Sequence, residues 1–438
     1  MVWYLAAGAL LVIVGLVGSR IERLPLTPAV LYLIVGVGLG PWVVGLIDVD
    51  PLTSASAIER FTEVALIISV FGAGLRLRVE PTWRAWLVPA RLAIVSMAIT
   101  VGLVALSAWQ FLGLSLGASL VLGAILAPTD PVLAAEVQVR DPWDRDSLRR
   151  ALTAEAGLND GTALAFLLLG FGLLGIHDIG PGGVRWLSLD IAYGTIGGLL
   201  LGAGIGVGLT RLVLRQRRRH GEAVGLDTFL TFGILSVTYG ASLATHVFGF
   251  LAVFAAGQGV RSVERRELGR EPSEEARRPA REAATHQVNA PAYMAHALLQ
   301  RTEQIERVAE LGLVVLVGAL LARASLGVAA LAFALLLIFA IRPVAVGLGL
   351  IGSHLGGRER GLTAWFGLRG IGSLYYLAHS VRQGLPVDDA ERIIGLTLTA
   401  VAVSIVVHGV SATPLLERHT RRLTTSSRGR RARNGVRV

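Results

Sequence analysis

The sequence contains no cysteine and little charge. Of its 438 residues none is Cys, and only 16% are Asp, Glu, Lys or Arg. The missing thiols exclude disulfide bonds, thiol catalysis and cysteine-ligated metals. The scarcity of charge, together with 53% hydrophobic residues and a mean hydropathy of +0.62, is far from the balance of a soluble globular protein. The composition therefore predicts a membrane-embedded chain.

Long apolar runs recur along the whole chain. Runs of roughly 20 residues, the length that crosses a bilayer, predict about 13 spans. The expected spans start near Val2, Thr27, Ala57, Leu87, Leu114, Leu148, Leu187, Leu226, Val247, Val308, Gly327, Leu362 and Ile393. The first run lacks a preceding basic region, so we expect a retained span rather than a cleaved signal peptide.

The basic residues lie between the apolar runs. Lys and Arg total 41 against 31 Asp and Glu, a net charge of +10. In a soluble chain this excess would suggest nucleic acid, but we expect no nucleic-acid partner because the arginines occupy loops. They gather after odd-numbered spans, and the main exceptions are Arg185, Arg323, Arg382 and Arg392. The positive-inside rule therefore predicts a plasma-membrane protein with its N-terminus outside and its C-terminus in the cytoplasm.

Four regions follow from these patterns. Residues 1–262 would hold spans one to nine, with the first repeat and linker helices, and residues 306–417 would hold spans ten to thirteen. Between them, residues 263–305 carry both charge signs and predict a cytoplasmic linker, partly helical and partly disordered. Residues 418–438 form a basic cytoplasmic tail that looks disordered. Contact with anionic lipid headgroups is its expected role, and regulation or partner binding is the alternative.

Glycines crowd one span, "GTIGGLLLGAGIGVGLT". Small residues at four-residue spacing let helices approach closely. We expect this stripe to pack within the molecule, and a dimer surface is the alternative.

An acid between two prolines interrupts another span, "ILAPTDPVLAAEV". Ionisable groups inside spans cost about 2.5 to 3.5 kcal/mol each, so they mark sites or pathways. Pro128 and Pro131 lack N–H groups and clash with the preceding turn, which predicts a broken helix around Thr129 and Asp130. The freed backbone groups would line a cavity or meet a ligand. A capped loop at the membrane edge is the alternative.

The next span, "LTAEAGLNDGTALAF", carries three polar residues. Helical spacing puts Glu155 and Asn159 on one face and rotates Asp160 by about 100° from Asn159. Their hard oxygens suit a monovalent cation, and a carboxylate holds either that cation or a proton. A buried structural network is the alternative.

Two arginines lie inside later spans. Arg342, in "LLLIFAIRPVAVGLG", needs a carboxylate partner. Glu155 is the candidate, which leaves Asp160 free to titrate. Arg369 lies among three glycines in "WFGLRGIGSLYYLAHS" and predicts a second broken helix. Paired breaks in the two halves of a chain are typical of inverted-repeat transporters. Alternatively, Arg369 only caps carbonyl groups at its own break.

Three histidines, His246, His379 and His408, are scattered through the later spans. We expect them to be satisfied or interfacial rather than part of a site.

Together these motifs resemble the sodium/proton antiporters of the monovalent cation/proton antiporter superfamily, in its electroneutral branch. The matching motifs, in order, are "TDP", "E-x-x-x-ND-G-T-A", "RP", "GLRGIGSLYYL" and "VVHGVSATPL". The resemblance runs from about Val64 to Leu416. It implies an all-α polytopic membrane protein of about 13 helices, built of inverted repeats, with two broken helices crossing near the membrane middle. It also implies a homodimer.

The resemblance assigns roles to individual residues. Asp160 would be the ion- and proton-binding carboxylate, and Asn159 would shape its site. Thr129 and Asp130 would contribute oxygens near the ion or cap the half-helices. The structural ion pair would consist of a glutamate and an arginine, at Glu155 and Arg342.

Two positions depart from the family pattern. Ala156 stands where the best-matching antiporters carry a serine that helps to hold the ion. Gly72, after Phe71, stands where many relatives have a glutamate. Both changes remove oxygen ligands, so the transported cation is open between sodium, potassium and lithium.

The resulting hypothesis is a secondary active transporter working by alternating access. Burial disfavours a charged carboxylate, so proton and cation compete for Asp160. One cation for one proton, as the resemblance implies, would be electroneutral. We expect sodium or potassium ions, protons, the lipid bilayer and a second copy as partners, with no cofactor and no enzymatic activity. The alternatives are a channel or ion sensor on the same fold and, more remotely, an intramembrane hydrolase using Asp130 and Asp160 as an aspartyl pair.

Overall fold

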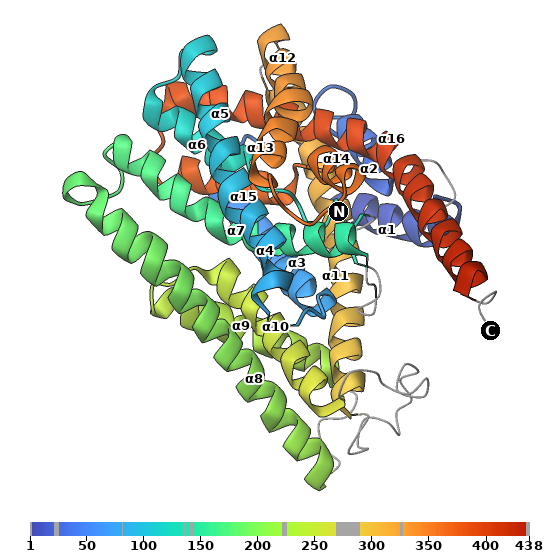
Figure 1. The fold of residues 1–438 in the computed structure, drawn as a ribbon. Helices are drawn as coiled ribbons and strands as arrows, with labels where there is room; N and C mark the ends of the chain where they lie inside the picture. The colour runs from blue at the N-terminus through green and yellow to red at the C-terminus, as the bar shows by residue number, and fades with distance from the viewer. Residues whose placement is uncertain are drawn as a thin grey trace.

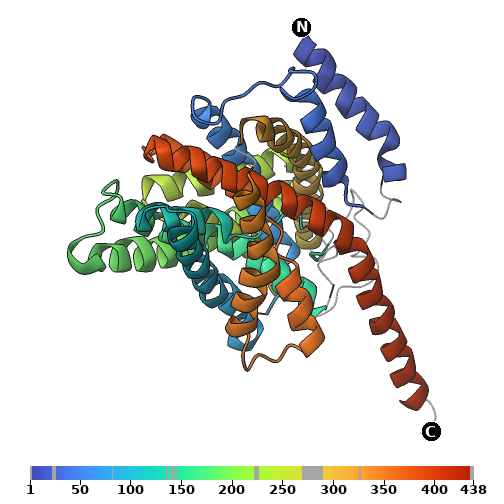
Figure 2. The ribbon, with the colours of Figure 1, turned by 90° about the horizontal axis from the view of Figure 1, so that it is seen from above.

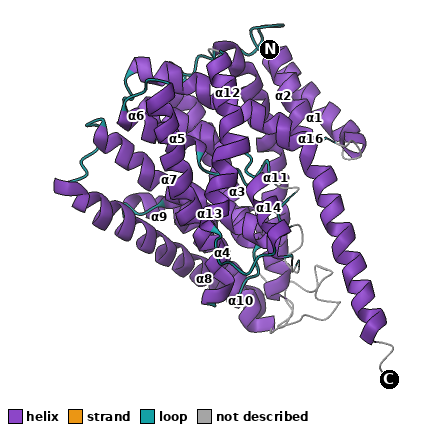
Figure 3. Cartoon of the chain, turned by 45° about the horizontal axis from the view of Figure 1, so that its top comes forward, coloured by secondary structure: helices purple, strands orange, loops and turns teal. Residues whose placement is uncertain are grey.

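Helices make up all regular secondary structure of the described chain (Figure 3). The computed structural model describes residues 2–21, 26–80, 82–134, 137–139, 144, 146–220, 226–268, 290–324 and 327–434. The all-α prediction is confirmed for these residues.

Figure 1 shows the helices coloured in the order in which they follow one another along the chain. The first group is α1 (Val2–Ile21), α2 (Pro28–Leu39), α3 (Ala55–Arg76), α4 (Trp83–Ala90), α5 (Met97–Phe111), α6 (Leu116–Leu126), α7 (Ser147–Leu173) and α8 (Gly194–His220). The second group is α9 (Asp227–Ala244), α10 (Gly249–Leu268), α11 (Ala290–Leu320), α12 (Val328–Leu336), α13 (Arg342–Gly349), α14 (Gly357–Trp365), α15 (Ile371–Arg382) and α16 (Val387–Asn434). Short π-helical segments join α4 to α5 and α12 to α13.

Several helical units have membrane length. Five in the described chain are long and apolar enough to cross a bilayer: Trp83–Phe111, Ser147–Leu173, Pro181–Arg217, Val328–Gly349 and Val387–Arg422. The expected spans coincide with helices or with helices in line. The tenth is the main difference, because α11 begins at Ala290 rather than near Val308.

Helix α3 lies near the centre of the molecule (Figure 1). It packs against α10 and α11 on one side and against α7 and α15 on another. Helix α3 therefore connects the helices that carry the polar motifs with the rest of the bundle.

Two spans are interrupted, as the prolines and glycines predict. Helix α6 ends at Leu126, and residues 131–134 form a turn instead of continuing it. Helix α14 ends at Trp365, and α15 begins at Ile371. The two interruptions meet, because the Asp130 N–H donates to the Leu368 carbonyl at 2.9 Å.

The charged segments are more helical than composition indicated. Helix α10 continues to Leu268 and α11 starts at Ala290, so both ends of the expected linker are helical, and its middle, residues 269–289, lies outside the described residues. Helix α16 continues to Asn434 through the tail that looked disordered, extending away from the bundle (Figure 2). Arginine is a good helix former, and extending an existing helix needs no new nucleus.

The glycine stripe packs inside the molecule. Gly198, Gly202 and Gly206 of α8 face the backbone of α10, and a Cβ on Gly202 would overlap the Ala252 carbonyl oxygen. Gly204, on the other face of α8, has no atom within 4 Å of such a Cβ. The seam between α8 and α10 therefore requires glycine on one face only.

A leucine at Gly202 should destabilise the protein strongly. Backbone atoms of α10 fill the space, so overpacking should cost at least about 1–3 kcal/mol. Gly204→Leu is the matched control and should leave the melting temperature in detergent close to that of the wild type. Equal thermal stability of the two variants would contradict this packing.

Candidate ion-binding site

Asp130 joins the two broken helices. Its Oδ1 accepts hydrogen bonds from the N–H groups of Val132 (2.7 Å) and Leu133 (3.1 Å), and its Oδ2 accepts one from the N–H of Ile371. Pro128 and Pro131 flank it, both buried. The carboxylate thus satisfies backbone donors on both sides of the crossing, including the N-terminal end of α15.

Thr129 and Asn159 lie together beside this crossing. The Asn159 side-chain amide donates to the Thr129 hydroxyl at 2.8 Å. Both residues are buried. The Asn159 side-chain oxygen has no hydrogen-bond partner among the described residues. This contact links α7 to the first break and leaves an unused acceptor in the interior.

Asp160 has the most unusual surroundings of the acids in this region. Its side chain is 0% exposed, and neither carboxylate oxygen has a hydrogen-bond partner within the described chain. The Tyr376 hydroxyl donates to its main-chain oxygen instead. Buried polar groups are nearly always satisfied, so two orphaned oxygens indicate a site for something the protein binds.

Helix α15 approaches this carboxylate through a glycine. A Cβ built at Gly372 would lie 2.8 Å from Asp160 Oδ1, closer than real contacts allow. The neighbouring Ser373 hydroxyl is also buried, with no partner within the described chain. The missing side chain at Gly372 therefore preserves the space beside the carboxylate.

The structure brings Glu155 and Arg342 together. Arg342 Nη1 donates to Glu155 Oε1 at 2.6 Å, and Nη2 donates to Oε2 at 2.9 Å. Both side chains are buried. This two-pronged geometry between α7 and α13 is the strongest form of a carboxylate–guanidinium contact.

Arg369 lies at the second break rather than among the acids. Its Nη1 donates to the Gly367 carbonyl at 3.0 Å, and its backbone N–H donates to the Ser404 hydroxyl at 2.9 Å. His408, on the same helix as Ser404, donates through Nε2 to the Trp365 carbonyl at 3.0 Å. Helix α16 therefore supports the break with two side chains.

Sequence reasoning missed this role of His408, together with Gly372 and Tyr376. The signals were present, because all three residues fall within motifs of the family resemblance. Spacing alone gave no indication of the groups they meet, which are main-chain carbonyls for His408 and Tyr376 and the Asp160 carboxylate for Gly372.

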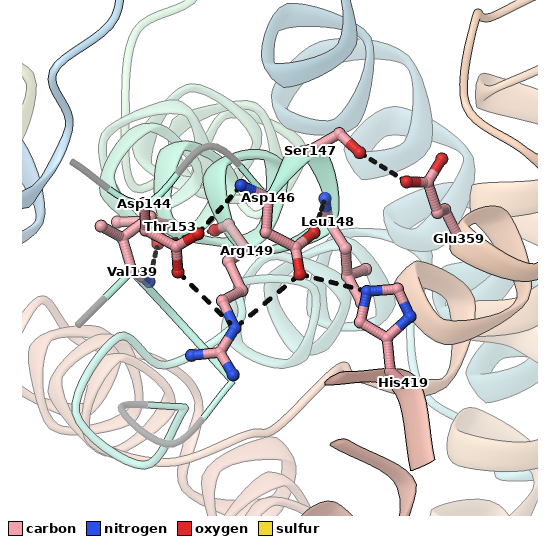
Figure 4. Close-up of polar contacts among 9 residues, drawn as sticks. All are labelled: Val139, Asp144, Asp146, Ser147, Leu148, Arg149, Thr153, Glu359 and His419. Atoms are coloured by element: carbon pink, nitrogen blue, oxygen red, sulfur yellow. Dashed lines mark hydrogen bonds and ion pairs between the residues drawn. The ribbon is translucent and has the colours of Figure 1, made fainter. Parts of the chain in front are cut away.

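The start of α7 is anchored to two other helices (Figure 4). Asp146 accepts the N–H of Leu148 at 2.9 Å and contacts His419 of α16 at 3.1 Å. Ser147 donates to Glu359 of α14 at 2.5 Å. An acid at this position is a favourable helix cap. The helix that carries Asp160 is thereby fixed to α14, which precedes the second break, and to α16.

The arrangement suits a transiently bound monovalent cation. It offers carboxylate, amide and hydroxyl oxygens, which are hard ligands. Ala156 is buried at the site and contributes no oxygen. No cluster of three or more His, Cys, Asp or Glu able to hold a metal ion occurs in the part of the chain that the structure describes. The oxygens available here are therefore of the kind that binds a monovalent cation or, at the carboxylate, a proton.

Comparison with known proteins gives a consistent assignment. The family model "Sodium/hydrogen exchanger, transmembrane" matches residues 8–418. The K(+)/H(+) antiporter NhaP of Alkalimonas amylolytica is 28% identical over 80% of this chain and 56% of its own length. The K(+)/H(+) antiporter NhaP2 of Shewanella oneidensis is 27% identical over 93% of this chain and 65% of its own length. The chain thus spans less than two thirds of either relative.

A solved structure shares the fold. The sodium proton antiporter MjNhaP1 of Methanocaldococcus jannaschii superposes with a TM-score of 0.69, at 21% sequence identity, covering 94% of this chain and 96% of that one. The likeness extends over nearly the whole chain.

Replacing Arg342 with alanine should reduce stability more than ion affinity. The change leaves the Glu155 carboxylate buried without its partner, which costs about 3–5 kcal/mol. Replacing both residues with apolar ones, as in Glu155→Leu with Arg342→Met, should recover much of the lost melting temperature. A raised cation KM in Arg342→Ala, with an unchanged melting temperature, would refute a mainly structural pair.

Proposed function

The chain belongs to the sodium/hydrogen exchanger family and is a multi-pass membrane protein, and we propose that it exchanges a monovalent cation for a proton across the membrane. This is a family of transporters, so no enzymatic reaction is expected. The exchange would be driven by the ion gradients themselves, without ATP.

One observation carries the proposal. The two Asp160 oxygens lie fully buried without a hydrogen-bond partner among the described residues. A carboxylate in such a place is stable only when neutralised, either by a proton or by a cation. Each substrate therefore displaces the other, which couples their movements.

The buried charges around Asp160 support an electroneutral exchange. Asp130 and Glu155 are acids, and Arg342 and Arg369 are bases, so their formal charges cancel. The net charge of these five side chains therefore equals the charge of Asp160 with whatever it binds. Bound to one proton or to one monovalent cation, the site is neutral, which lowers the cost of carrying it through an apolar environment.

The site-bearing helices form one unit suited to alternating access. Asp130 ties the first break to α15, Glu155 ties α7 to α13, and Ser147 ties α7 to α14. A rigid-body shift of this unit against the remaining helices would expose Asp160 to one side of the membrane and then the other. We place the N-terminus outside and the C-terminus in the cytoplasm of the plasma membrane, and we propose a homodimer.

The cation remains a choice between sodium and potassium. Ala156 supplies no oxygen, which weakens the case for sodium, the smaller and more strongly hydrated ion. The relatives from Alkalimonas and Shewanella carry potassium in their names, and the Methanocaldococcus protein carries sodium. We therefore propose potassium alongside sodium, with lithium as a third ion to test.

Proteoliposomes test the proposal directly. Purified protein with an internal pH dye should move protons when an outward or inward gradient of sodium, potassium or lithium is applied, with no net current. Asp160→Asn should abolish the exchange, since the amide can neither release a proton nor bind a cation strongly. Uncoupled cation current would indicate a channel instead.

Asp178→Asn is the matched control. Asp178 lies in a loop after α7, its side chain is 71% exposed, and it pairs with Arg185 at the surface. This variant should transport like the wild type. Full exchange in Asp160→Asn would remove Asp160 from the proposed site.

A further inference from the structure

A second buried acid lies beside the glycine that departs from the family pattern. Glu306 of α11 is 5% exposed. A Cβ built at Gly72 of α3 would overlap its carboxylate, and the Thr302 methyl group lies 3.0 Å from the same point. The carboxylate of Glu306 thus occupies the space that a side chain at position 72 would enter.

Arg76 fixes this carboxylate in place. The arginine, buried one turn along α3, donates through Nη2 to Glu306 Oε2 and lies 3.5 Å from Oε1 through Nη1. It also reaches Glu303 at 3.5 Å, a residue whose side chain is 35% exposed. Arg76 therefore contacts two acids, the buried Glu306, called here the inner acid, and the more exposed Glu303, the outer acid.

The inner acid lies against the helix that also contacts α7, which carries Asp160. Ala73, next to Gly72, contacts α7 where a Cβ on Gly157 would lie 3.3 Å from the Ala73 Cβ. Gly157 is one helical turn before Asp160. Helix α3 therefore contacts Glu306 through Gly72 and the helix that carries Asp160 through the neighbouring Ala73.

We propose that Glu306 is an acidic residue of the cation-binding region, supplied by α11 through the opening that Gly72 leaves in α3. Its negative charge lowers the energy of a monovalent cation near Asp160 and so sets the apparent cation affinity. Arg76 keeps the Glu306 carboxylate oriented when the cation is absent. This inference rests on the proposed exchange.

The alternative explanation of the same contacts is a purely structural ion pair that joins α3 to α11. Both readings expect a loss of stability when Glu306 is changed, because Arg76 loses its buried partner. They differ in cation affinity, since only a residue acting on the cation changes KM in a stable variant.

The first test compares the two acids of Arg76 in proteoliposomes. Glu306→Gln should raise the KM for sodium and potassium about tenfold, the effect of one lost charge interaction at close range, and leave the maximal rate within about twofold. Glu303→Gln, the control, should leave KM within about twofold of the wild type.

The second test moves the carboxylate from α11 to α3. Glu306→Ala empties the space beside Gly72, and adding Gly72→Glu returns a carboxylate to it from the other helix. The double variant should recover most of the cation KM lost in Glu306→Ala. Gly72→Gln with Glu306→Ala restores the volume without the charge and should not recover KM.

Cation-dependent thermal stability in detergent gives an independent readout. Sodium or potassium should raise the melting temperature of the wild type and of Glu303→Gln, and much less that of Glu306→Gln. A wild-type protein that exchanges ions alongside a Glu306→Gln variant with unchanged KM would overturn this inference alone. A wild type that neither exchanges nor is stabilised by a cation would overturn the proposed function and this inference with it.

Discussion

A charge buried among apolar helices must be neutralised where it lies, and this constraint organises the interior of the protein. Arg342 is paired with Glu155, and Arg76 with Glu306. The Asp130 carboxylate is stabilised differently, by hydrogen bonds from backbone N–H groups at the ends of interrupted helices. The cost of an uncompensated charge in such an environment is large, so each pairing is also a structural contact between distant helices.

The two interruptions are stable because each satisfies the other. A helix that stops in the interior exposes carbonyl and N–H groups with no water to receive them. Here the chain at Asp130 donates to Leu368, and its side chain accepts from Ile371. Either break alone would leave these backbone groups unpaired, whereas together the two breaks supply each other with partners.

Sequence alone predicted the features that repeat along the chain or that break a pattern. Apolar runs gave the spans, and Pro128 and Pro131 gave the first interruption. Glu155 was the candidate partner of Arg342 because a buried arginine demands an acid, and the family resemblance implied the same pair. These predictions depend on the type of a residue and on its near neighbours in the chain, both of which can be read from the sequence.

The rest depends on which helices lie side by side. Arg76 and Glu306 are 230 residues apart, and no periodicity links them. The early start of α11 had a visible signal, because Pro291, Met294, Ala295 and Leu298 repeat at helical spacing and are buried. The charged residues between them led to the prediction of a linker. A linker prediction gave no reason to expect a buried environment for Glu306. The role of His408 had no such signal, because its partner is the Trp365 carbonyl group, which only the second break leaves free.

Helix α16 fixes the spacing between two of its contacts. It touches the second break through His408 and the first turn of α7 through His419, and both contacts are made by one helix that runs on through Pro414. At 1.5 Å per residue these two points are about 17 Å apart along its axis. The distance between the second break and the start of α7 is thus set by the rise of one helix rather than by the length of a loop.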